Sequence, residues 1–218
     1  MRVGLLGGSF NPAHGGHAHV AETARVRLGL DRVVWLVSPG NPLKRAAPPL
    51  ATRMVSARRV ARGPAMIVSD VEARMGSRYT IDTVRLLKAR HPSVRFVWLM
   101  GADNLAQFHL WRGWTDLLRE VPVAVIARPG AQLRSRFAPA AARFAHARRA
   151  ARAARGLPGA KPPAWVYLNA PLNPVSSTAL RAQAEAQRSA SGPNNLSRSA
   201  LMMPAVAPQM NCSPQGMA

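Results

Sequence analysis

Short, nearly uninterrupted apolar runs recur along the first 170 residues, separated by longer segments of mixed apolar and polar residues. Such runs are typical of strands buried on both faces, and the segments between them predict helices. The strands are expected at residues 3–6, 33–37, 65–68, 94–100, 121–127 and 165–168, and the helices at 15–28, 52–61, 80–90, 114–119 and 177–187. Gly29 is expected to end the first helix, and Thr52 to cap the second. Thr115 or Asp116 is expected to cap the fourth.

The alternation of buried strands with helices predicts an α/β fold, a doubly wound, Rossmann-like parallel sheet with helices on both faces. Two segments depart from this pattern. Residues 131–160 are rich in Ala and Arg and are interpreted as a solvated helical excursion. Residues 188–218 are rich in Ser, Pro, Asn and Met without periodicity, which predicts a disordered tail after a single domain over residues 1–187.

The composition excludes several classes of protein. A length of 218 residues with 48% apolar residues is enough for one domain with a real hydrophobic core. The single cysteine, Cys212, excludes a disulfide framework and a cysteine-rich zinc module. No apolar run approaches the roughly 18–20 residues that cross a membrane, and the N-terminal run is too short for a signal peptide. We therefore expect a cytoplasmic protein that makes no use of a membrane.

The net charge of +21 is unusual, and three explanations for it are considered. It favours a nucleic-acid partner at first sight. However, only Lys44, Lys88 and Lys161 among the 30 basic residues are lysines, and the bias toward Arg and Ala is also what a GC-rich coding sequence produces. A small polyanionic substrate would be attracted by the same field. Nucleic acid is therefore the less favoured partner.

The strongest chemical signal is the string Gly7-Gly8-Ser9-Phe10-Asn11-Pro12-Ala13-His14-Gly15-Gly16-His17, which joins the first strand to the first helix. Glycines let a ligand approach the backbone, and a helix start offers unpaired N–H groups to phosphate. His14 and His17 are three residues apart, so they share one face of the first turn and can donate to phosphate oxygens. The string contains neither the Gly-Lys-Ser/Thr of a Walker A loop nor the Rossmann Gly-x-Gly-x-x-Gly.

This string resembles the (H/T)xGH motif of the nucleotidylyltransferase superfamily. A second segment, Val175-Ser176-Ser177-Thr178-Ala179-Leu180-Arg181, is similar to the superfamily's ISSTxxR motif. Hydroxyl side chains that open a helix, with an arginine one turn later, can form a second phosphate clamp.

Four further segments resemble one family, the bacterial nicotinate-nucleotide adenylyltransferases. They are the Pro-rich loop Ser38-Pro39-Gly40-Asn41-Pro42-Leu43-Lys44, Arg78-Tyr79-Thr80-Ile81-Asp82-Thr83, Gly101-Ala102-Asp103-Asn104-Leu105 followed by Trp111 and Trp114, and Ala127-Arg128-Pro129-Gly130. The resemblance covers residues 2–182. It implies the reaction of ATP with nicotinate mononucleotide, which gives nicotinate adenine dinucleotide and pyrophosphate in NAD biosynthesis, with Mg²⁺ carried by ATP.

The resemblance also implies the residues of the site. The catalytic residues would be His14, His17, Lys44 and Arg181. ATP would be bound by Gly7, Gly8, Ser9, Phe10, His17, Asp103, Ser176, Ser177, Thr178 and Arg181. Nicotinate mononucleotide would be bound by Ser9, Lys44, Thr80, Asp103, Trp111 and Arg128. No residues with metal-ligand spacing are found, so no metal site of the protein's own is expected.

Asn11 stands where the family usually has Asp, which removes one charge from the loop. Three alternatives remain open at this point: a sister enzyme that uses nicotinamide mononucleotide, one that uses phosphopantetheine, and a non-catalytic RNA-binding protein on the same fold. The oligomeric state is also open.

Overall fold

The computed structural model describes residues 1–40, 47–127, 135, 137–170 and 187. The chain divides into two units, Met1–Arg181 and Ala182–Ala218, and everything below concerns the first of them. The helix expected at 177–187 lies outside the described residues except for Gln187, and so does the tail from residue 188. No helix in the described part of the chain is both long and apolar enough to cross a membrane.

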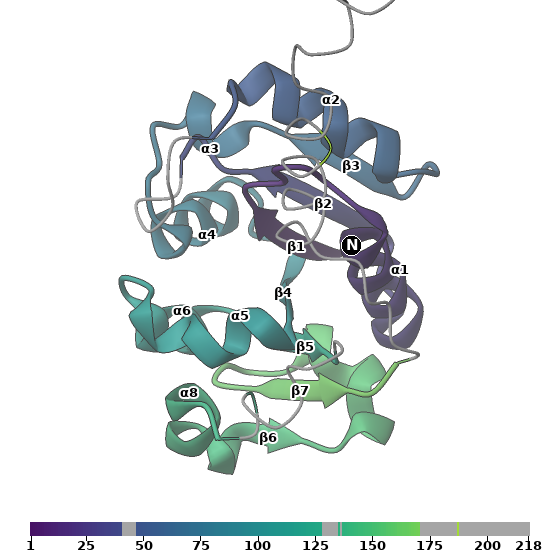
Figure 1. Ribbon diagram of the computed structural model, residues 1–218. Helices are drawn as coiled ribbons and strands as arrows, with labels where there is room; N and C mark the ends of the chain where they lie inside the picture. The colour runs from purple at the N-terminus through teal and green to yellow at the C-terminus, as the bar shows by residue number, and fades with distance from the viewer. Residues whose placement is uncertain (41–46, 128–134, 136, 171–186, 188–218) are drawn as a thin grey trace, which may run out of the picture. The chain divides into compact units, whose positions relative to one another are not determined.

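Seven strands of the described residues form one parallel sheet in the order β3-β2-β1-β4-β5-β7-β6 (Figure 1). The strands are β1 (Arg2–Gly8), β2 (Arg32–Val37), β3 (Met66–Ser69), β4 (Arg95–Gly101), β5 (Val123–Ile126), β6 (Arg148–Arg149) and β7 (Trp165–Leu168). The six predicted strands are confirmed, and the fold class with them. The two-residue β6 contains no apolar run and was not predicted. The chain winds outward from β1 in both directions, so β1 and β4 flank the switch point of the sheet.

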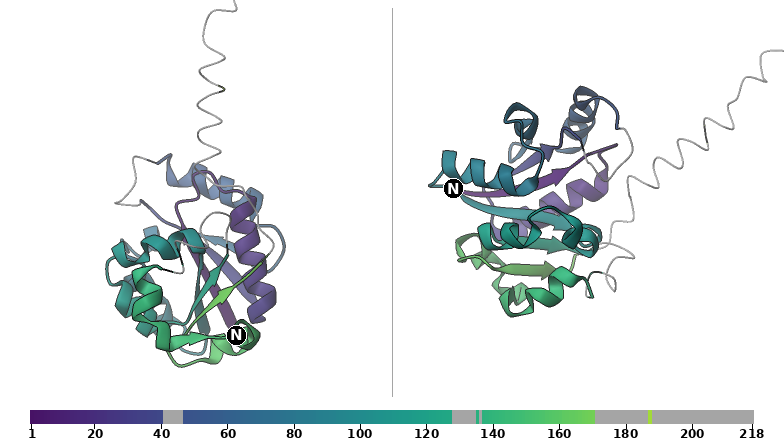
Figure 2. Two further views of the ribbon diagram at one scale, coloured as in Figure 1. Left: turned by 60° about the horizontal axis from the view of Figure 1, so that its bottom comes forward. Right: turned by 90° about the vertical axis from the view of Figure 1, so that its left-hand side faces the viewer.

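The two faces of the sheet are buried under different helices, as the alternation of side chains along each strand requires. Leu6 belongs to a core that includes α1 (Gly15–Leu28), α2 (Leu50–Val60) and the 3₁₀ segment η3 (Ala151–Gly159). Leu5 belongs to a core formed with α4 (Thr80–Arg90), α5 (Ala102–Gln107), α6 (Trp114–Glu120) and α8 (Pro139–Arg143). Figure 2 shows these two layers on opposite sides of the strands. The remaining short elements are α3 (Val71–Arg74), η1 (Phe108–Leu110) and η2 (Ala145–Ala147).

The helix boundaries confirm part of the prediction and correct the rest. The first helix ends at Gly29, whose φ of 63° is the left-handed conformation that glycine adopts without strain. The second helix begins two residues earlier than expected, with Pro49 at the N-cap in place of Thr52. The N-cap of α6 is Gly113, with φ of 67°, and neither Thr115 nor Asp116. In both cases the backbone geometry of the preceding turn decides where the helix starts, and no side-chain cap is used.

The segment 131–160 is not one helical excursion in its described part. It contains the short α8, two 3₁₀ segments and β6, and Pro158 lies inside the second 3₁₀ segment. Its solvation is also uneven, because Ala154 and Leu157 are buried in the same core as α1. Arg152 and Arg155 of the same 3₁₀ segment are exposed.

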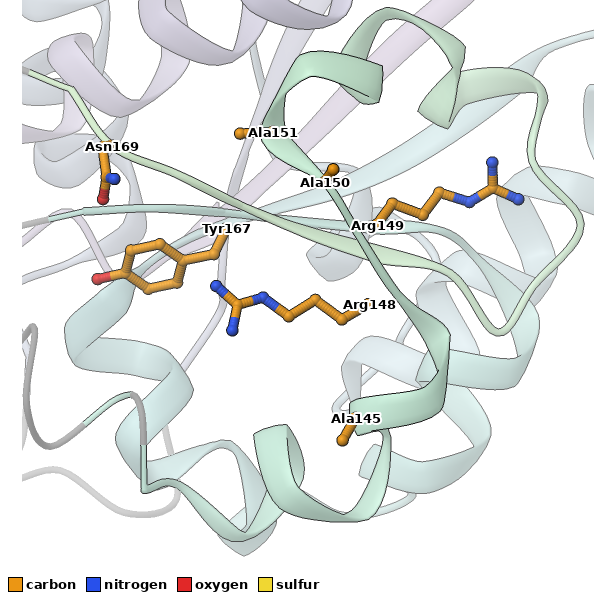
Figure 3. A pocket seen from close by; sticks show the side chains of 7 residues that line it. All are labelled: Ala145, Arg148, Arg149, Ala150, Ala151, Tyr167 and Asn169. Atoms are coloured by element: carbon orange, nitrogen blue, oxygen red, sulfur yellow. The ribbon is translucent and has the colours of Figure 1, made fainter.

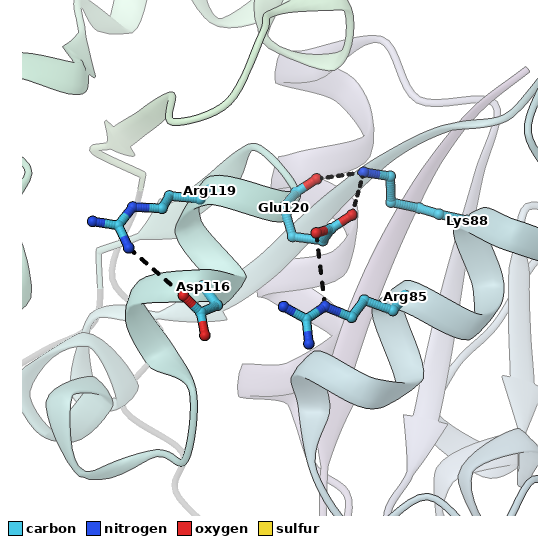
Figure 4. A network of polar contacts seen from close by, with 5 residues as sticks. All are labelled: Arg85, Lys88, Asp116, Arg119 and Glu120. Carbon is cyan, nitrogen blue, oxygen red and sulfur yellow. Dashed lines mark hydrogen bonds and ion pairs between the residues drawn. The ribbon is translucent and has the colours of Figure 1, made fainter.

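Ion pairs on the protein surface connect α4 to α6 (Figure 4). The Lys88 ammonium donates to the Glu120 carboxylate at 2.6 Å and to the Glu120 backbone carbonyl at 2.8 Å. Arg85 lies 3.8 Å from the other carboxylate oxygen of Glu120. Arg119 and Asp116 form a looser pair within α6, at 3.6 Å. Glu120 is the most buried of these side chains, so the contacts to it carry most of what the network contributes.

We predict that Glu120→Ala lowers the free energy of unfolding by about 1 kcal/mol, because it removes the two contacts between helices. Asp116→Ala is the matched control, and it should change stability by less than about 0.5 kcal/mol because its pair is exposed and local. Urea unfolding followed by tryptophan fluorescence measures both variants. Equal losses in the two variants would show that the contact between α4 and α6 is not the stabilising part.

Candidate active site

The predicted loop residues and Asp103 lie where the carboxyl ends of β1 and β4 are side by side. The glycine-containing loop leaves β1 and leads into α1, and Asp103 follows directly after β4. Doubly wound sheets commonly bind ligands at the point where the chain turns in opposite directions after two neighbouring strands. This placement is consistent with the prediction that phosphate groups bind at the end of β1.

The loop after β1 is packed closely from below. A Cβ atom at Gly7 would overlap the indole ring of Trp98, so only glycine fits at this position near the end of β1. Phe10 adopts a φ of 46°, a left-handed conformation that is costly for an aromatic residue. Its ring is fully buried, with its centroid 5.2 Å from that of Trp35 and 4.9 Å from that of His17. The loop is therefore held in a strained conformation by packing on both sides.

The start of α1 is capped by the two histidines of the motif. The Nδ1 atom of His14 accepts a hydrogen bond from the Gly16 N–H at 3.1 Å, and Nδ1 of His17 accepts one from the His14 N–H at 3.3 Å. An accepting nitrogen carries no hydrogen, so in each neutral imidazole the proton is placed on Nε2. The capping arrangement thus sets both tautomers and makes Nε2 the donor atom of each ring.

The two imidazole rings form a contiguous pair at the positive end of the α1 dipole. Their centroids lie 3.9 Å apart, and His14 is 5% exposed. Backbone N–H groups at a helix start together with N–H donors on one face form a site for anions. The arrangement can hold phosphate oxygens and stabilise charge that develops on them.

Arg53, which the sequence did not identify as a site residue, stabilises this loop through a hydrogen bond to its backbone. Arg53 of α2 is buried, and its guanidinium donates to the backbone carbonyl of Ser9 at 2.9 Å. One turn further along, the Ser56 hydroxyl accepts from the Ala13 N–H at 3.1 Å. Nothing in the sequence separates Arg53 from the exposed Arg58 and Arg59 of the same helix. Only the burial found in the structure does so.

Asp103 is exposed and is the second residue of α5, at the carboxyl end of β4. The N-cap of α5 is Gly101, and no side chain caps this helix. Its position next to β1 brings it to the same edge of the sheet as the glycine loop. A carboxylate there can accept hydrogen bonds from hydroxyl groups of a bound sugar.

Thr80 and Trp111 come from segments that contact each other. Thr80 is the first residue of α4, and Trp111 follows η1. The Arg112 guanidinium, next to Trp111, lies 4.5 Å from the ring centroid of Tyr79, which precedes Thr80. The Trp111 ring packs edge to face against Trp98 at 6.2 Å. Trp111 thus packs against β4, and a partly exposed indole is suited to stacking on an aromatic ring.

A buried polar cluster supports the turn that leads to Thr80. The Ser77 and Thr83 hydroxyls lie 2.7 Å apart, and both also bond the Tyr79 carbonyl. The Thr83 hydroxyl donates to the Glu72 carboxylate at 3.3 Å. Burial raises the pKa of Glu72 from its ordinary value of 4.5 to about 7, and the Thr83 hydrogen bond opposes this rise only in part.

The predicted residues Lys44, Arg128, Ser176, Ser177, Thr178 and Arg181 lie outside the described residues. Among the described residues, no three His, Cys, Asp or Glu side chains lie close enough together to hold a metal ion.

A cavity of about 660 Å³ lies elsewhere, on β6 and β7 (Figure 3). It is lined by Ala145, Arg148, Arg149, Ala150, Ala151, Tyr167 and Asn169. None of the predicted site residues lines it, and β7 is three strands away from β1 in the sheet. The Arg148 guanidinium lies 5.9 Å from the ring centroid of Tyr167, so aromatic contacts already engage part of this surface.

The raised pKa of Glu72 predicts a pH dependence of stability. Because the folded chain keeps this proton to higher pH than the unfolded chain, the free energy of unfolding falls as the pH rises from about 4.5 to about 7. Glu72→Gln removes this dependence, so we expect its stability relative to the unmodified protein to rise by up to about 3 kcal/mol between pH 5 and pH 8. Urea unfolding across this pH range measures the difference.

Glu22→Gln is the control for this experiment. The hydrogen bond from Arg25 lowers the pKa of Glu22, so this carboxylate is ionised in both states above pH 5 and its variant should show a flat difference. A flat difference for Glu72→Gln as well would mean that Glu72 is ionised in the folded chain at neutral pH.

Comparison with known proteins agrees with the geometry. Residues 5–183 match the cytidylyltransferase-like family. A protein of Caulobacter sp. named as a probable nicotinate-nucleotide adenylyltransferase is 67% identical over 183 residues, which cover 83% of this chain and 97% of that protein. A protein of Cereibacter sphaeroides with the same name is 58% identical, covering 84% of this chain and 97% of that protein.

Among solved structures, the nicotinic acid mononucleotide adenylyltransferase of Plasmodium falciparum complexed with NaAD is similar, with a TM-score of 0.62. The likeness covers 83% of this chain and 82% of that one at 16% identity, so it shows the fold alone. The resemblance noted in the sequence is confirmed by the two bacterial relatives. The chain therefore belongs to the cytidylyltransferase-like family, among the nicotinate-nucleotide adenylyltransferases.

Proposed function

We propose that this protein transfers AMP from ATP to nicotinate mononucleotide, giving nicotinate adenine dinucleotide and pyrophosphate, and that it does so in the cytoplasm as a step of NAD biosynthesis. The observation that carries the proposal is the pair His14 and His17 at the start of α1. They cap the helix with Nδ1, so their Nε2 donors lie at the positive end of its dipole beside the loop after β1.

The proposed reaction requires the protein to align the two substrates and to stabilise the charge that develops on the phosphate oxygens. The phosphate of nicotinate mononucleotide attacks the α-phosphorus of ATP, the bond to the β-phosphate oxygen breaks, and pyrophosphate leaves. No covalent intermediate on the protein is needed. The donors of His14 and His17 would meet the charge that builds up on the phosphate oxygens in the transition state. The loop of Gly7, Gly8, Ser9 and Phe10 would let the nucleotide lie close to the backbone.

The nicotinate ring would bind between Thr80 and Trp111, whose segments are joined by the contact of Arg112 with Tyr79. Asp103 would accept hydrogen bonds from ribose hydroxyls. By family resemblance, Lys44 and Arg128 would bind phosphate, and Ser176, Ser177, Thr178 and Arg181 would form the second clamp. These last six assignments depend on the motifs and not on geometry.

Mg²⁺ is proposed to arrive with ATP. A single carboxylate, that of Asp103, lies at the end of β4, and the described residues hold no cluster of metal ligands. Such a donor set is too small for a cage of the protein's own, whereas phosphate oxygens supply most ligands of Mg²⁺ in nucleotide sites. When bound, the ion neutralises phosphate charge. The protein's own donors then orient the two substrates.

We predict that His17→Ala lowers kcat at least about 100-fold, which is the usual effect of removing one donor to a transition-state oxyanion. Pyrophosphate release measures the rate. His146→Ala is the control, because His146 lies in η2 and no motif contains it. Thermal unfolding is measured in parallel, since the loss of a cap on α1 by itself costs only about 1 kcal/mol. If kcat of the folded His17→Ala variant fell by less than tenfold, His17 would not be a stabiliser of the transition state.

The substrate assignment is tested by pyrophosphate release with ATP and Mg²⁺, comparing nicotinate mononucleotide with nicotinamide mononucleotide. We expect release with the first and little with the second. Equal release would keep the reaction and overturn the acid preference. Release with neither would overturn the proposal, and 4′-phosphopantetheine and RNA would be tested next. A steep loss of RNA binding with salt would identify the latter.

A further inference from the structure

Arg53 occupies an unusual environment for a charged residue. It lies in α2 with 3% of its surface exposed, and among the described residues its guanidinium donates to four backbone carbonyls. The acceptors are Ser9 at 2.9 Å, Ser38 at 2.7 Å, Pro39 at 3.1 Å and Pro48 at 3.0 Å. No carboxylate of the described residues forms an ion pair with it. Within the part of the chain that is described, its positive charge is therefore hydrogen-bonded to neutral groups and has no carboxylate partner.

The four carbonyls belong to two loops at the same edge of the sheet. Ser9 follows β1, and Ser38 and Pro39 follow β2, its parallel neighbour. One guanidinium thus holds both loops at a fixed separation. The bond from Ala13 to Ser56, one turn along α2, fixes the far end of the first loop as well.

A carbonyl that points at Arg53 determines where the N–H of the same peptide points. The Ser9–Phe10 and Pro39–Gly40 peptides are trans, so each N–H is directed opposite to its carbonyl, away from the guanidinium. The Phe10 and Gly40 N–H groups donate to no backbone carbonyl of the described residues. A charged donor on the carbonyl also polarises the peptide, which makes its N–H a stronger donor.

The strained backbone of Phe10 fits this picture. Its φ of 46° costs free energy and persists only where the surroundings determine it fully. The buried ring fixes one side of the residue, and the bond from Arg53 to the Ser9 carbonyl fixes the peptide that precedes it. With the Ser9 carbonyl turned to Arg53, the Phe10 N–H of the same trans peptide is directed away from the guanidinium.

We propose that Arg53 is a positioning residue of the phosphate-binding loop: it orients the Phe10 and Gly40 N–H groups toward the nucleotide triphosphate without touching the nucleotide itself. This inference rests on the proposed function for the identity of its ligand, ATP. Arg53 also places a buried, uncompensated positive charge behind the site where anions bind, and that charge is screened by salt much less than a charge on the surface.

The test compares Arg53→Lys and Arg53→Ala with Arg58→Ala, which removes an exposed arginine from the same helix. Binding of a non-hydrolysable ATP analogue is measured by calorimetry, and kcat and KM by pyrophosphate release. For Arg53→Lys we expect the Kd of the analogue to rise at least tenfold and kcat to fall at least tenfold. One ammonium cannot serve four carbonyls in the geometry of a planar fork. KM for ATP should rise at least tenfold, in parallel with the Kd of the analogue.

Chemical rescue separates positioning from mere stability. Added guanidinium at millimolar concentration should restore at least a third of the analogue affinity to Arg53→Ala. If that variant does not fold, Arg53→Lys carries the test through its Kd. An unchanged Kd in folded Arg53→Lys, or a similar weakening in Arg58→Ala, would overturn the proposal and leave Arg53 a structural residue.

The outcomes also separate this proposal from the proposed function. If the unmodified protein binds the analogue but releases no pyrophosphate, the proposed function fails and the effect on Kd still decides the role of Arg53. If the unmodified protein turns over normally and Arg53→Lys binds the analogue equally well, only the role of Arg53 fails. If the unmodified protein does not bind the analogue at all, both are overturned.

Discussion

Burial of both faces of the parallel sheet is the constraint on which the site depends. Leu5 and Leu6 point into different cores, so neither face of β1 is left for a ligand. Backbone groups that are not used by the sheet occur only where strands end and helices begin. Strand order reverses at β1 and β4, the point at which doubly wound sheets commonly bind ligands. The loop after β1 and the start of α1 are therefore where this chain offers backbone donors to the proposed nucleotide.

The histidines at this helix start would serve the fold and the proposed chemistry through different ring atoms. Nδ1 of each ring accepts a backbone N–H, which satisfies donors that a helix start would otherwise leave unpaired. The same bonds hold each ring in the orientation and tautomer that make Nε2 the donor proposed for phosphate. This explains why the histidines are three residues apart: the spacing of a capping box and the spacing of one helix face coincide at the first turn.

The sequence predicted those parts of the fold that depend on hydrophobic runs and on glycine. The strands and α1 were found because apolar periodicity and Gly29 are local signals. The starts of α2 and α6 were misplaced because Pro49 and Gly113 act through backbone geometry and not through a capping side chain. The motif residues His14, His17 and Asp103 follow the carboxyl ends of two neighbouring strands, β1 and β4. Arg53 could not be found this way, because its role comes from contacts with residues 5 to 44 positions away.

Exposed arginines and Arg53, the one arginine buried among the described residues, would act on different parts of the proposed reaction. Exposed arginines such as Arg58 and Arg59 are screened over a Debye length of about 8 Å at physiological salt, so they affect mainly how fast an anionic substrate arrives. Arg53 is buried and donates to carbonyls of the loops after β1 and β2. In the proposed role, its charge and its geometry act on the bound state, whereas the roles of Arg128 and Arg181 are proposed from the motifs alone. Burial, and not abundance, therefore separates Arg53 from the exposed arginines of the same helix.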